Sequence, residues 1–407
     1  MRVLFLIHNF PPQSIGGHQI RCQRTAEGLR KRGHEVLVLT TYRWGDSPSK
    51  EGYVWRLLRS RWSEPPKRSI FNWVSVYRHN IKIYQRVLSE FQPDVVCQWN
   101  LTWCTVAFVK YVYQNTPCPV VKIGGGMIPG RNLSLLEDGW THFCQTIPSN
   151  PFRRWVKKLV VKIASFWMPT EPQKIVYDTA TFLSKFDLQQ CLRYGMEVKN
   201  PVVLYQGVDT SSFLPRTPRD YQNPPRFLFA NRLDPDKDAL TFLAAVEKLL
   251  QRGYPVKGSI AGGDSLDAEY RQEVLKRIGS LNGVIQFMDR VPPNEMPRVF
   301  QNHDVFVIGF GVGWIGMSTL EAMTCGLAPI ISAFEDVDGL LTEGEICLFY
   351  PFGDADALAE QMERLIREPQ LVIKLGQNAQ RLANERFTMD RYLDDTEALL
   401  ESVVCKA

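Results

Sequence analysis

Apolar residues along the chain gather into short continuous runs that alternate with stretches of helical periodicity. In the first half, these runs are Arg2–Ile7, Glu35–Thr40, Val95–Gln98, Pro119–Ile123, Lys174–Thr179 and Val202–Tyr205. In the second half, they are Arg226–Ala230, Lys257–Ala261, Val284–Met288, Asp304–Ile308, Leu327–Ser332 and Cys347–Tyr350. Continuous apolar strands between helices are typical of a parallel sheet that is covered on both faces. The pattern therefore predicts an α/β protein with two doubly wound, Rossmann-like halves.

The length of the chain also favours two domains. Its 407 residues exceed the roughly 250–300 residues at which a single core stops growing. The segment Leu214–Pro225 holds four prolines and is typical of a linker. We therefore expect an N-terminal domain over residues 1–214 and a C-terminal domain over residues 215–388. Residues 389–407 are predicted to form a helix that joins the N-terminal domain, and ligands are expected in the crevice at the carboxyl ends of the strands.

Two segments of the first half interrupt the alternation, and we expect less regular structure there. They are approximately Trp44–Arg78 and Gly130–Pro172. The second contains Phe152–Met168, in which basic and apolar residues interleave and aromatic residues stand at both ends. Two interpretations of this segment remain open. It is either an amphipathic helix on an anionic membrane, at the inner face of the cell membrane, or a helix packed on its own domain with a solvated basic face.

Charge and cysteine content narrow the class of protein. Residues 1–200 hold 28 basic and 13 acidic residues, a net charge of +15, whereas the remainder has a net charge of −10. The basic half favours a negatively charged partner surface, and no nucleic-acid partner is expected. The nine cysteines are scattered and never spaced as CxxC, which argues against a zinc site or disulfide framework and indicates a reducing, cytoplasmic compartment. No apolar run approaches the ~18–20 residues of a membrane span.

Several motifs of the second half occur in the order seen in a known enzyme family. They are FANRLDPDKDALTFLAA (229–245), SIAGGDS (259–265), MSTLEAMTCGLAPIIS (317–332), LFYPFGDADALAEQMERL (348–365) and ERFTMDR (385–391). Together they resemble retaining glycosyltransferase family 4, the group 1 glycosyltransferases of the GT-B fold, in which two Rossmann-like domains face a central cleft. The first half resembles this family only in patches, FPPQSIGGHQ to LRKRGHEVLVLTT (10–41), PDVV (93–96) and QGVDTSSF (206–213).

The resemblance implies a hexosyltransferase. Such an enzyme moves a sugar from a UDP- or GDP-sugar to a glycan or lipid-linked acceptor, in polysaccharide or glycoconjugate biosynthesis. It implies that the N-terminal domain binds the acceptor and that the C-terminal domain binds the nucleotide sugar. The short Gly16-Gly17 pair lacks GxGxxG spacing, which argues against a dinucleotide redox site.

The resemblance also implies which side chains perform the chemistry. Arg232 and Lys237 stand at the positions of the family's diphosphate-binding pair. Breaking the nucleotide–sugar bond leaves negative charge on the departing diphosphate, and fixed cations lower that barrier. Arginine offers a fork for two phosphate oxygens and lysine a point charge. Glu321 lies in the apolar run Leu-Glu-Ala-Met, where a charge needs a partner, and the resemblance implies that it holds the donor ribose hydroxyls.

Small residues and backbone groups complete the predicted donor site. Gly316 precedes a predicted helix over 319–324, and free N–H groups at a helix start bind anions. The Gly16-Gly17 pair is implied to face the diphosphate from the other domain, with an ordinary tight turn as the alternative. The predicted donor-binding set is Gly16, Gly17, Gly262, Gly263, Val291, Gly313, Gly316, Met317 and Ser318.

Two positions depart from the family's pattern. Gly313 replaces a glutamate that contacts the transferred sugar in the family, and Gly124 replaces a frequent histidine. These departures leave open a degenerate glycosyltransferase that serves as a nucleotide-sugar-binding or scaffold subunit. A sugar-nucleotide epimerase on the same fold is a further alternative, which the Glu-Ala-Met context disfavours.

Two Asp-x-Asp matches raise the question of a metal, because this pattern binds metal in another glycosyltransferase fold. Asp354 follows Pro-Phe-Gly and precedes a predicted helix, so it is expected to be an N-cap. Asp234 and Asp236 flank Pro235 between the two predicted cations, and Asp236 is expected to adjust that loop. We therefore predict no required metal and no cofactor, since the nucleotide sugar is a substrate.

Overall fold

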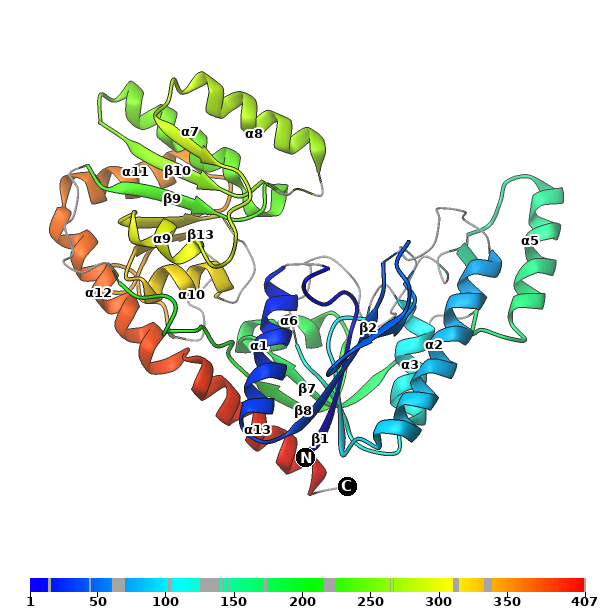
Figure 1. Ribbon diagram of the computed structural model, residues 1–407. Helices are drawn as coiled ribbons and strands as arrows, with labels where there is room; N and C mark the ends of the chain where they lie inside the picture. The colour runs from blue at the N-terminus through cyan, green and yellow to red at the C-terminus, as the bar shows by residue number, and fades with distance from the viewer. Residues whose placement is uncertain are drawn as a thin grey trace. The chain divides into compact units, whose positions relative to one another are not determined.

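The chain folds into two compact units in the computed structural model (Figure 1). The structure describes residues 1–13, 16–43, 45–60, 70–101, 104–124, 140, 143–144, 146–170, 174–215, 224–263, 265, 267–309, 315–332 and 339–405. Unit 1 comprises Met1–Leu183, Asp187–Leu204 and Leu393–Ala407, and unit 2 comprises Tyr205–Tyr392 with Ser184–Phe186. Helix α13 (Met389–Val404) begins in unit 2 and continues in unit 1.

Unit 1 is built on an eight-stranded sheet in the order β3-β4-β2-β1-β5-β6-β7-β8. Its strands are β1 (Arg2–Ile7), β2 (Glu35–Thr41), β3 (Ser49–Glu51), β4 (Val54–Leu58), β5 (Val95–Gln98), β6 (Val120–Lys122), β7 (Val176–Phe182) and β8 (Glu197–Val203). Among the described strands of this unit, only the β3–β4 pair is antiparallel. The described helices of unit 1, besides α13, include α1 (Gly17–Lys31), α2 (Ile70–Phe91), α3 (Val106–Asn115), α5 (Pro151–Ala164) and α6 (Lys185–Arg193).

The described residues of the segment Trp44–Arg78, 45–60 and 70–78, are more regular than the sequence predicts. Strands β3 and β4 extend the sheet, and β4 pairs in parallel with β2. Arg56 interrupts the apolar run of β4 but is buried, because its guanidinium donates to the carbonyl oxygens of Phe10 (3.1 Å) and Pro11 (2.6 Å). A buried arginine that is satisfied by a distant loop cannot be recognised from local periodicity, so the prediction of an irregular insertion was wrong over residues 45–60.

Unit 2 contains a six-stranded sheet in the order β11-β10-β9-β12-β13-β14, with every pair parallel. Its strands are β9 (Arg226–Ala230), β10 (Lys257–Ala261), β11 (Ile285–Met288), β12 (Val305–Ile308), β13 (Ala328–Ser332) and β14 (Leu348–Tyr350). Its described helices, besides the start of α13, include α7 (Ala239–Gln251), α8 (Ala268–Ser280), α9 (Met296–Gln301), α10 (Met317–Thr324), α11 (Ala355–Arg367), α12 (Pro369–Arg386) and the 3₁₀ turn η2 (Pro235–Lys237). The strand order reverses between β9 and β12, which is the switch point where doubly wound sheets bind ligands.

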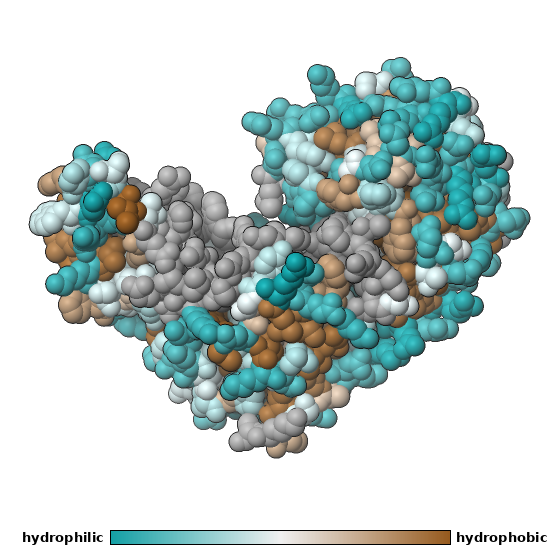
Figure 2. Space-filling view, turned by 180° about the vertical axis from the view of Figure 1, so that it is seen from behind, coloured by the Kyte–Doolittle hydropathy of each residue, from teal (hydrophilic) through white to brown (hydrophobic). Residues whose placement is uncertain are grey.

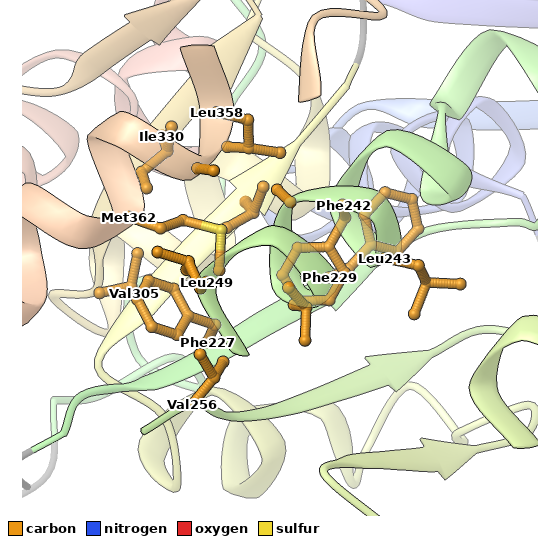
Figure 3. Close-up of a cluster of buried hydrophobic side chains, with 14 of the residues drawn as sticks. Phe227, Phe229, Phe242, Leu243, Leu249, Val256, Val305, Ile330, Leu358 and Met362 are labelled. Atoms are coloured by element: carbon orange, nitrogen blue, oxygen red, sulfur yellow. The ribbon is translucent and has the colours of Figure 1, made fainter. Parts of the chain in front are cut away.

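Successive residues of β9 point to opposite faces of the sheet, and both faces are covered. On one face, Phe227 and Phe229 pack against α7 and α11, and Phe229 stacks on Phe242 with ring centroids 6.2 Å apart (Figure 3). On the other face, Leu228 belongs to a cluster with apolar residues of α10 and α12. This arrangement confirms the predicted α/β class with two Rossmann-like domains.

The last helix belongs largely to unit 1. Arg32 and His34 of unit 1 contact Glu397 of α13 at 2.9 and 2.6 Å. The segment preceding the predicted linker instead packs within unit 2, where the Val208 N–H donates to the Phe387 carbonyl at 2.7 Å. The nine cysteines are free thiols. None of the helices in the described part of the chain combines the length and the apolar character that a membrane crossing requires.

Candidate functional site

The loop that follows β9 places two cations at the switch point of unit 2. Arg232 pairs with Asp234 at 2.9 Å, and its side chain remains 47% exposed. Lys237 pairs with Asp236 at 3.1 Å, and its side chain is only 10% exposed. Burial lowers the pKa of Lys237, Asp236 opposes this effect, and the positive charge of Arg232 lowers the pKa further. The structure therefore brings both predicted diphosphate-binding residues together in one loop.

Close packing against the end of β12 holds this loop in place. Asp238 has a left-handed φ of 57° and accepts hydrogen bonds from Thr241 Oγ1 (2.8 Å) and the Gly353 N–H (3.1 Å). Gly309 follows β12, and a Cβ there would lie 2.9 Å from the Lys237 carbonyl oxygen. The loop with both cations thus rests on the neighbouring strand across the switch point.

Helix α10 follows β12 and presents its N-terminus without a side-chain cap. Gly316 is the N-cap residue, and a Cβ there would meet only Thr319 Oγ1, at 3.8 Å. The Gln206 side-chain amide donates to the Ile315 carbonyl and so positions the chain that leads into the helix. The first N–H groups of a helix lack intrahelical partners and attract anions, which suits the roles predicted for Met317 and Ser318.

Glu321 lies on α10 and is half-buried. Its helical neighbours Leu320, Ala322 and Met323 are fully buried. The carboxylate therefore stands at the boundary between the apolar cluster of unit 2 and the helix surface. This position is compatible with the predicted ribose contact, which stays a prediction.

The glycines after β10 are required by contacts within the chain. Gly262 has a φ of +148°, and a Cβ there would lie 1.8 Å from the Asn231 carbonyl oxygen. At Gly263, a Cβ would meet the flexible carboxylate of Asp289. Val291 is half-buried beside the apolar cluster that contains Leu320. Gly262 thus allows the loops after β9 and β10 to touch, whereas donor contacts at these three positions stay predictions.

Three of the predicted donor-binding positions lie away from the described part of unit 2. Gly313 lies outside the described residues. Gly16 and Gly17 belong to unit 1, where Gly16 is the N-cap of α1 and α1 follows β1 at the point where the strand order of that sheet reverses.

Four basic side chains gather near the carboxyl ends of β1 and β6 in unit 1, and sequence analysis missed them. Burial lowers the pKa of His18, and the charges of Arg21, His8 and Lys122 lower it further. The Arg21 guanidinium lies 5.1 Å from the Trp99 ring and donates to the Gly124 carbonyl. The spacing of His18 and Arg21 on the first turns of α1 was the available signal. Burial lowers the pKa of His8 as well, so this cluster favours an anionic group mainly through Arg21 and Lys122.

The structure explains the glycine at position 124. A Cβ there would lie 1.8 Å from the Thr181 carbonyl oxygen, and the Gly124 N–H donates to Thr181 Oγ1 at 2.7 Å. With this backbone, no histidine fits at the position. The departure from the family's pattern therefore reflects a close approach between the loop after β6 and strand β7.

The Asp-x-Asp matches have partners within the chain. Asp354 caps α11, accepting from the N–H groups of Asp356 (3.1 Å) and Ala357 (3.0 Å), which confirms the N-cap prediction. Asp234 and Asp236 pair with the two cations. Among the described residues, no group of three or more His, Cys, Asp and Glu side chains could hold a metal ion.

Comparison with known proteins shows which proteins this chain resembles. Residues 213–382 match the family model described as Glycosyl transferases group 1. An uncharacterized glycosyltransferase of Methanocaldococcus jannaschii is 24% identical, with 97% of each chain covered. The sulfoquinovosyl transferase of Arabidopsis thaliana is 21% identical over 90% of this chain and 67% of its own. A phosphatidyl-myo-inositol mannosyltransferase of Mycolicibacterium smegmatis is 28% identical over 44% of this chain and 47% of its own.

Solved structures share the fold of the whole chain. A sucrose-phosphate synthase from Thermosynechococcus elongatus has a TM-score of 0.73 at 15% identity, with all of both chains covered. An Anabaena protein solved in complex with UDP and glucose has a TM-score of 0.68 at 15% identity, covering 99% of this chain and 100% of its own. These likenesses show the two-domain GT-B fold that the sequence resemblance implied.

Proposed function

We propose that this chain, a glycosyltransferase of the GT-B fold, transfers a sugar from a UDP- or GDP-sugar with retention of configuration, as a member of family 4. One observation carries the proposal. Arg232 and Lys237 lie in one loop at the switch point of unit 2, and the uncapped start of α10 follows the strand on the other side of that point. Two cations and a helix N-terminus at this place suit a diphosphate.

The proposed reaction depends on stabilising the negative charge of the departing diphosphate. When the bond between the anomeric carbon and the β-phosphate oxygen breaks, the diphosphate takes the electron pair and gains negative charge. Arg232 and Lys237 stabilise that charge, and their partners Asp234 and Asp236 keep them oriented before the donor arrives. A pair of charges about 4 Å apart at an effective dielectric near 20 contributes roughly 4 kcal/mol before desolvation. Lys237 is mostly buried, which strengthens this interaction.

The acceptor is proposed to be a glycan or a lipid-linked group bound by unit 1. The basic cluster of His8, His18, Arg21 and Lys122, together with Gly16 and Gly17, offers an anionic part of the substrates a binding place. Two kinds of relatives are named for phosphate-bearing inositols, a phosphatidyl-myo-inositol mannosyltransferase and D-inositol 3-phosphate glycosyltransferases. We place the reaction in polysaccharide or glycoconjugate biosynthesis.

A second candidate function is a nucleotide-sugar-binding or scaffold subunit without turnover. It is favoured by Gly124, where no side chain fits, and by Gly313 in the sequence. A panel of nucleotide sugars, screened by calorimetry and by release of the nucleoside diphosphate, separates the two functions. Binding with release supports the transferase, whereas tight binding without release to any acceptor supports the scaffold.

Transfer is expected to persist in excess EDTA. The cations Arg232 and Lys237 and the start of α10 neutralise the diphosphate without help from a metal. The initial rate should be measured in EDTA and again after magnesium or manganese is added. A rate that falls in EDTA and returns with either metal contradicts this prediction.

Replacing Glu321 with glutamine is expected to weaken donor binding by about tenfold, because a hydrogen bond to a charged group contributes roughly 1.5–3 kcal/mol. The change keeps the shape of the side chain and removes its charge. The dissociation constant for the nucleoside diphosphate should be measured by calorimetry, with Glu360→Gln on the exposed side of α11 as the control. An unchanged constant in Glu321→Gln argues against the ribose contact.

A further inference from the structure

Helix α5 presents its apolar stripe to solvent. The exposed fractions of Phe152, Trp155 and Phe166 are 71%, 62% and 78%. Further exposed residues of this segment are Val156, Leu159, Ile163 and Trp167. Phe152, Trp155, Val156, Leu159 and Ile163 recur at helical spacings of three and four, which places them along one face of α5, and Phe166 and Trp167 follow in the turn after the helix. A stripe that normally faces a core here faces outward, and we call it the α5 stripe.

The opposite face of α5 is anchored to unit 1. Ala164 and Met168 are buried in the apolar cluster of that unit. Lys157 bends inward, where its ammonium donates to the Thr146 carbonyl and lies 4.6 Å from the Phe143 ring centroid. Asn150 caps the helix by accepting from the N–H groups of residues 152 and 153. The helix is therefore fixed on its unit while the α5 stripe stays uncovered, at the outer edge of unit 1 in Figure 1.

Basic side chains border the α5 stripe. Arg153, Arg154, Lys158 and Lys162 are exposed, and residues 146–170 contain no acidic side chain. No carboxylate of the described residues forms an ion pair with these four. Figure 2, seen from behind, shows apolar and polar side chains next to one another over this edge of the unit. Apolar and aromatic groups flanked by cations match the interface of an anionic bilayer, where the rings sit at the headgroup level.

We propose that the α5 stripe docks on the surface of an anionic phospholipid bilayer. A second copy of this chain is a poor partner for the α5 stripe, because two α5 helices packed face to face would bring like charges together. The proposal goes beyond the donor chemistry of unit 2 and does not depend on it. A membrane-bound α5 would hold unit 1 at the bilayer surface, where a lipid-linked acceptor is found.

Sedimentation of the full chain with vesicles tests this proposal. We expect binding to vesicles of equal parts phosphatidylglycerol and phosphatidylcholine at low salt, and little binding to phosphatidylcholine alone. High salt should weaken binding, since the screening length falls from about 10 Å at 0.1 M to about 3 Å at 1 M. Lys158→Ser with Lys162→Ser should lower the partition coefficient by roughly 20- to 30-fold. Trp155→Ser with Phe166→Ser should lower it by at least about tenfold.

Matched variants control for charge, apolarity and folding. Lys31→Ser with Lys82→Ser removes the same charge from other exposed positions of unit 1, and Leu192→Ser with Leu214→Ser removes exposed apolar groups elsewhere. Both pairs should bind vesicles almost like the wild type, and all variants should keep the wild-type melting temperature. Wild-type protein that ignores anionic vesicles at low salt overturns the proposal. So does a wild-type dimer that becomes monomeric in the Trp155/Phe166 variant without any vesicle binding.

Discussion

Replacing Arg232 with alanine is expected to lower the rate of sugar transfer by about 10²–10³-fold, because one partner of the developing diphosphate charge is lost. Lys237→Ala is expected to have a similar effect. The rate should be measured under saturating donor and acceptor. Arg252→Ala and Lys248→Ala are matched controls, since these residues also pair with carboxylates, Glu363 and Asp356, on the surface of unit 2. They should transfer at nearly the wild-type rate.

A stability effect must be separated from the chemical effect. Arg232→Ala removes the cation that pairs with the buried Asp234, whose other carboxylate oxygen accepts from Ser265 at 3.0 Å. Leaving a buried charge without its ion-pair partner is costly. The double variant Arg232→Ala with Asp234→Asn should therefore recover stability but not transfer. Wild-type turnover in Arg232→Ala or Lys237→Ala contradicts the diphosphate assignment.

Replacing Gly262 with alanine is expected to lower the free energy of unfolding by about 3 kcal/mol or more, because an alanine is strained at this φ and its Cβ would overlap a carbonyl oxygen. The backbone lies at a φ of +148°, and the Cβ would stand 1.8 Å from the Asn231 oxygen. The change should also weaken donor binding, since Asn231 adjoins Arg232. Urea unfolding and calorimetry with the nucleoside diphosphate measure the two effects.

Gly279→Ala is the matched control for this change. Gly279 lies in α8, and a Cβ there meets nothing within 4 Å. An alanine in a helix is favoured over glycine by about 0.5–1 kcal/mol, so this variant should be as stable as the wild type or slightly more stable. Equal stabilities of Gly262→Ala and Gly279→Ala contradict the close packing of the loops after β9 and β10.

Much of the fold could be predicted because most strand pairs are parallel and the sheet of unit 2 is covered on both faces. Strands β1, β9 and β10 begin and end at the residues of the predicted apolar runs. Strand β4 was not predicted because Arg56 interrupts its apolar run. The groups that allow Arg56 to be buried, the carbonyls of Phe10 and Pro11, are distant in sequence. Local sequence patterns identify strands whose buried residues are all apolar. They miss a strand in which a buried polar side chain is satisfied by residues distant in the sequence.

Some residues of the candidate site could likewise be predicted from local sequence, and others could not. Arg232 and Lys237 could be predicted because both lie in one short loop after a strand. The basic cluster of unit 1 could not, because Lys122 comes from β6 while His18 and Arg21 come from α1, and only the order of the sheet brings them together. A helix was expected within Phe152–Met168, where the structure has α5, but the sequence pattern did not reveal which face is exposed. The structure shows that its apolar stripe is uncovered.

Release of the nucleoside diphosphate tests the central claim most directly. The full chain should be incubated with a panel of UDP- and GDP-sugars and candidate glycan or lipid-linked acceptors, beside Arg232→Ala and Lys237→Ala. We expect at least one donor to give UDP or GDP together with a glycosylated acceptor, and each variant to lower that rate by about 10²–10³-fold. If no UDP- or GDP-sugar is bound or turned over, or if both variants match the wild type, the assignment of the donor site is contradicted.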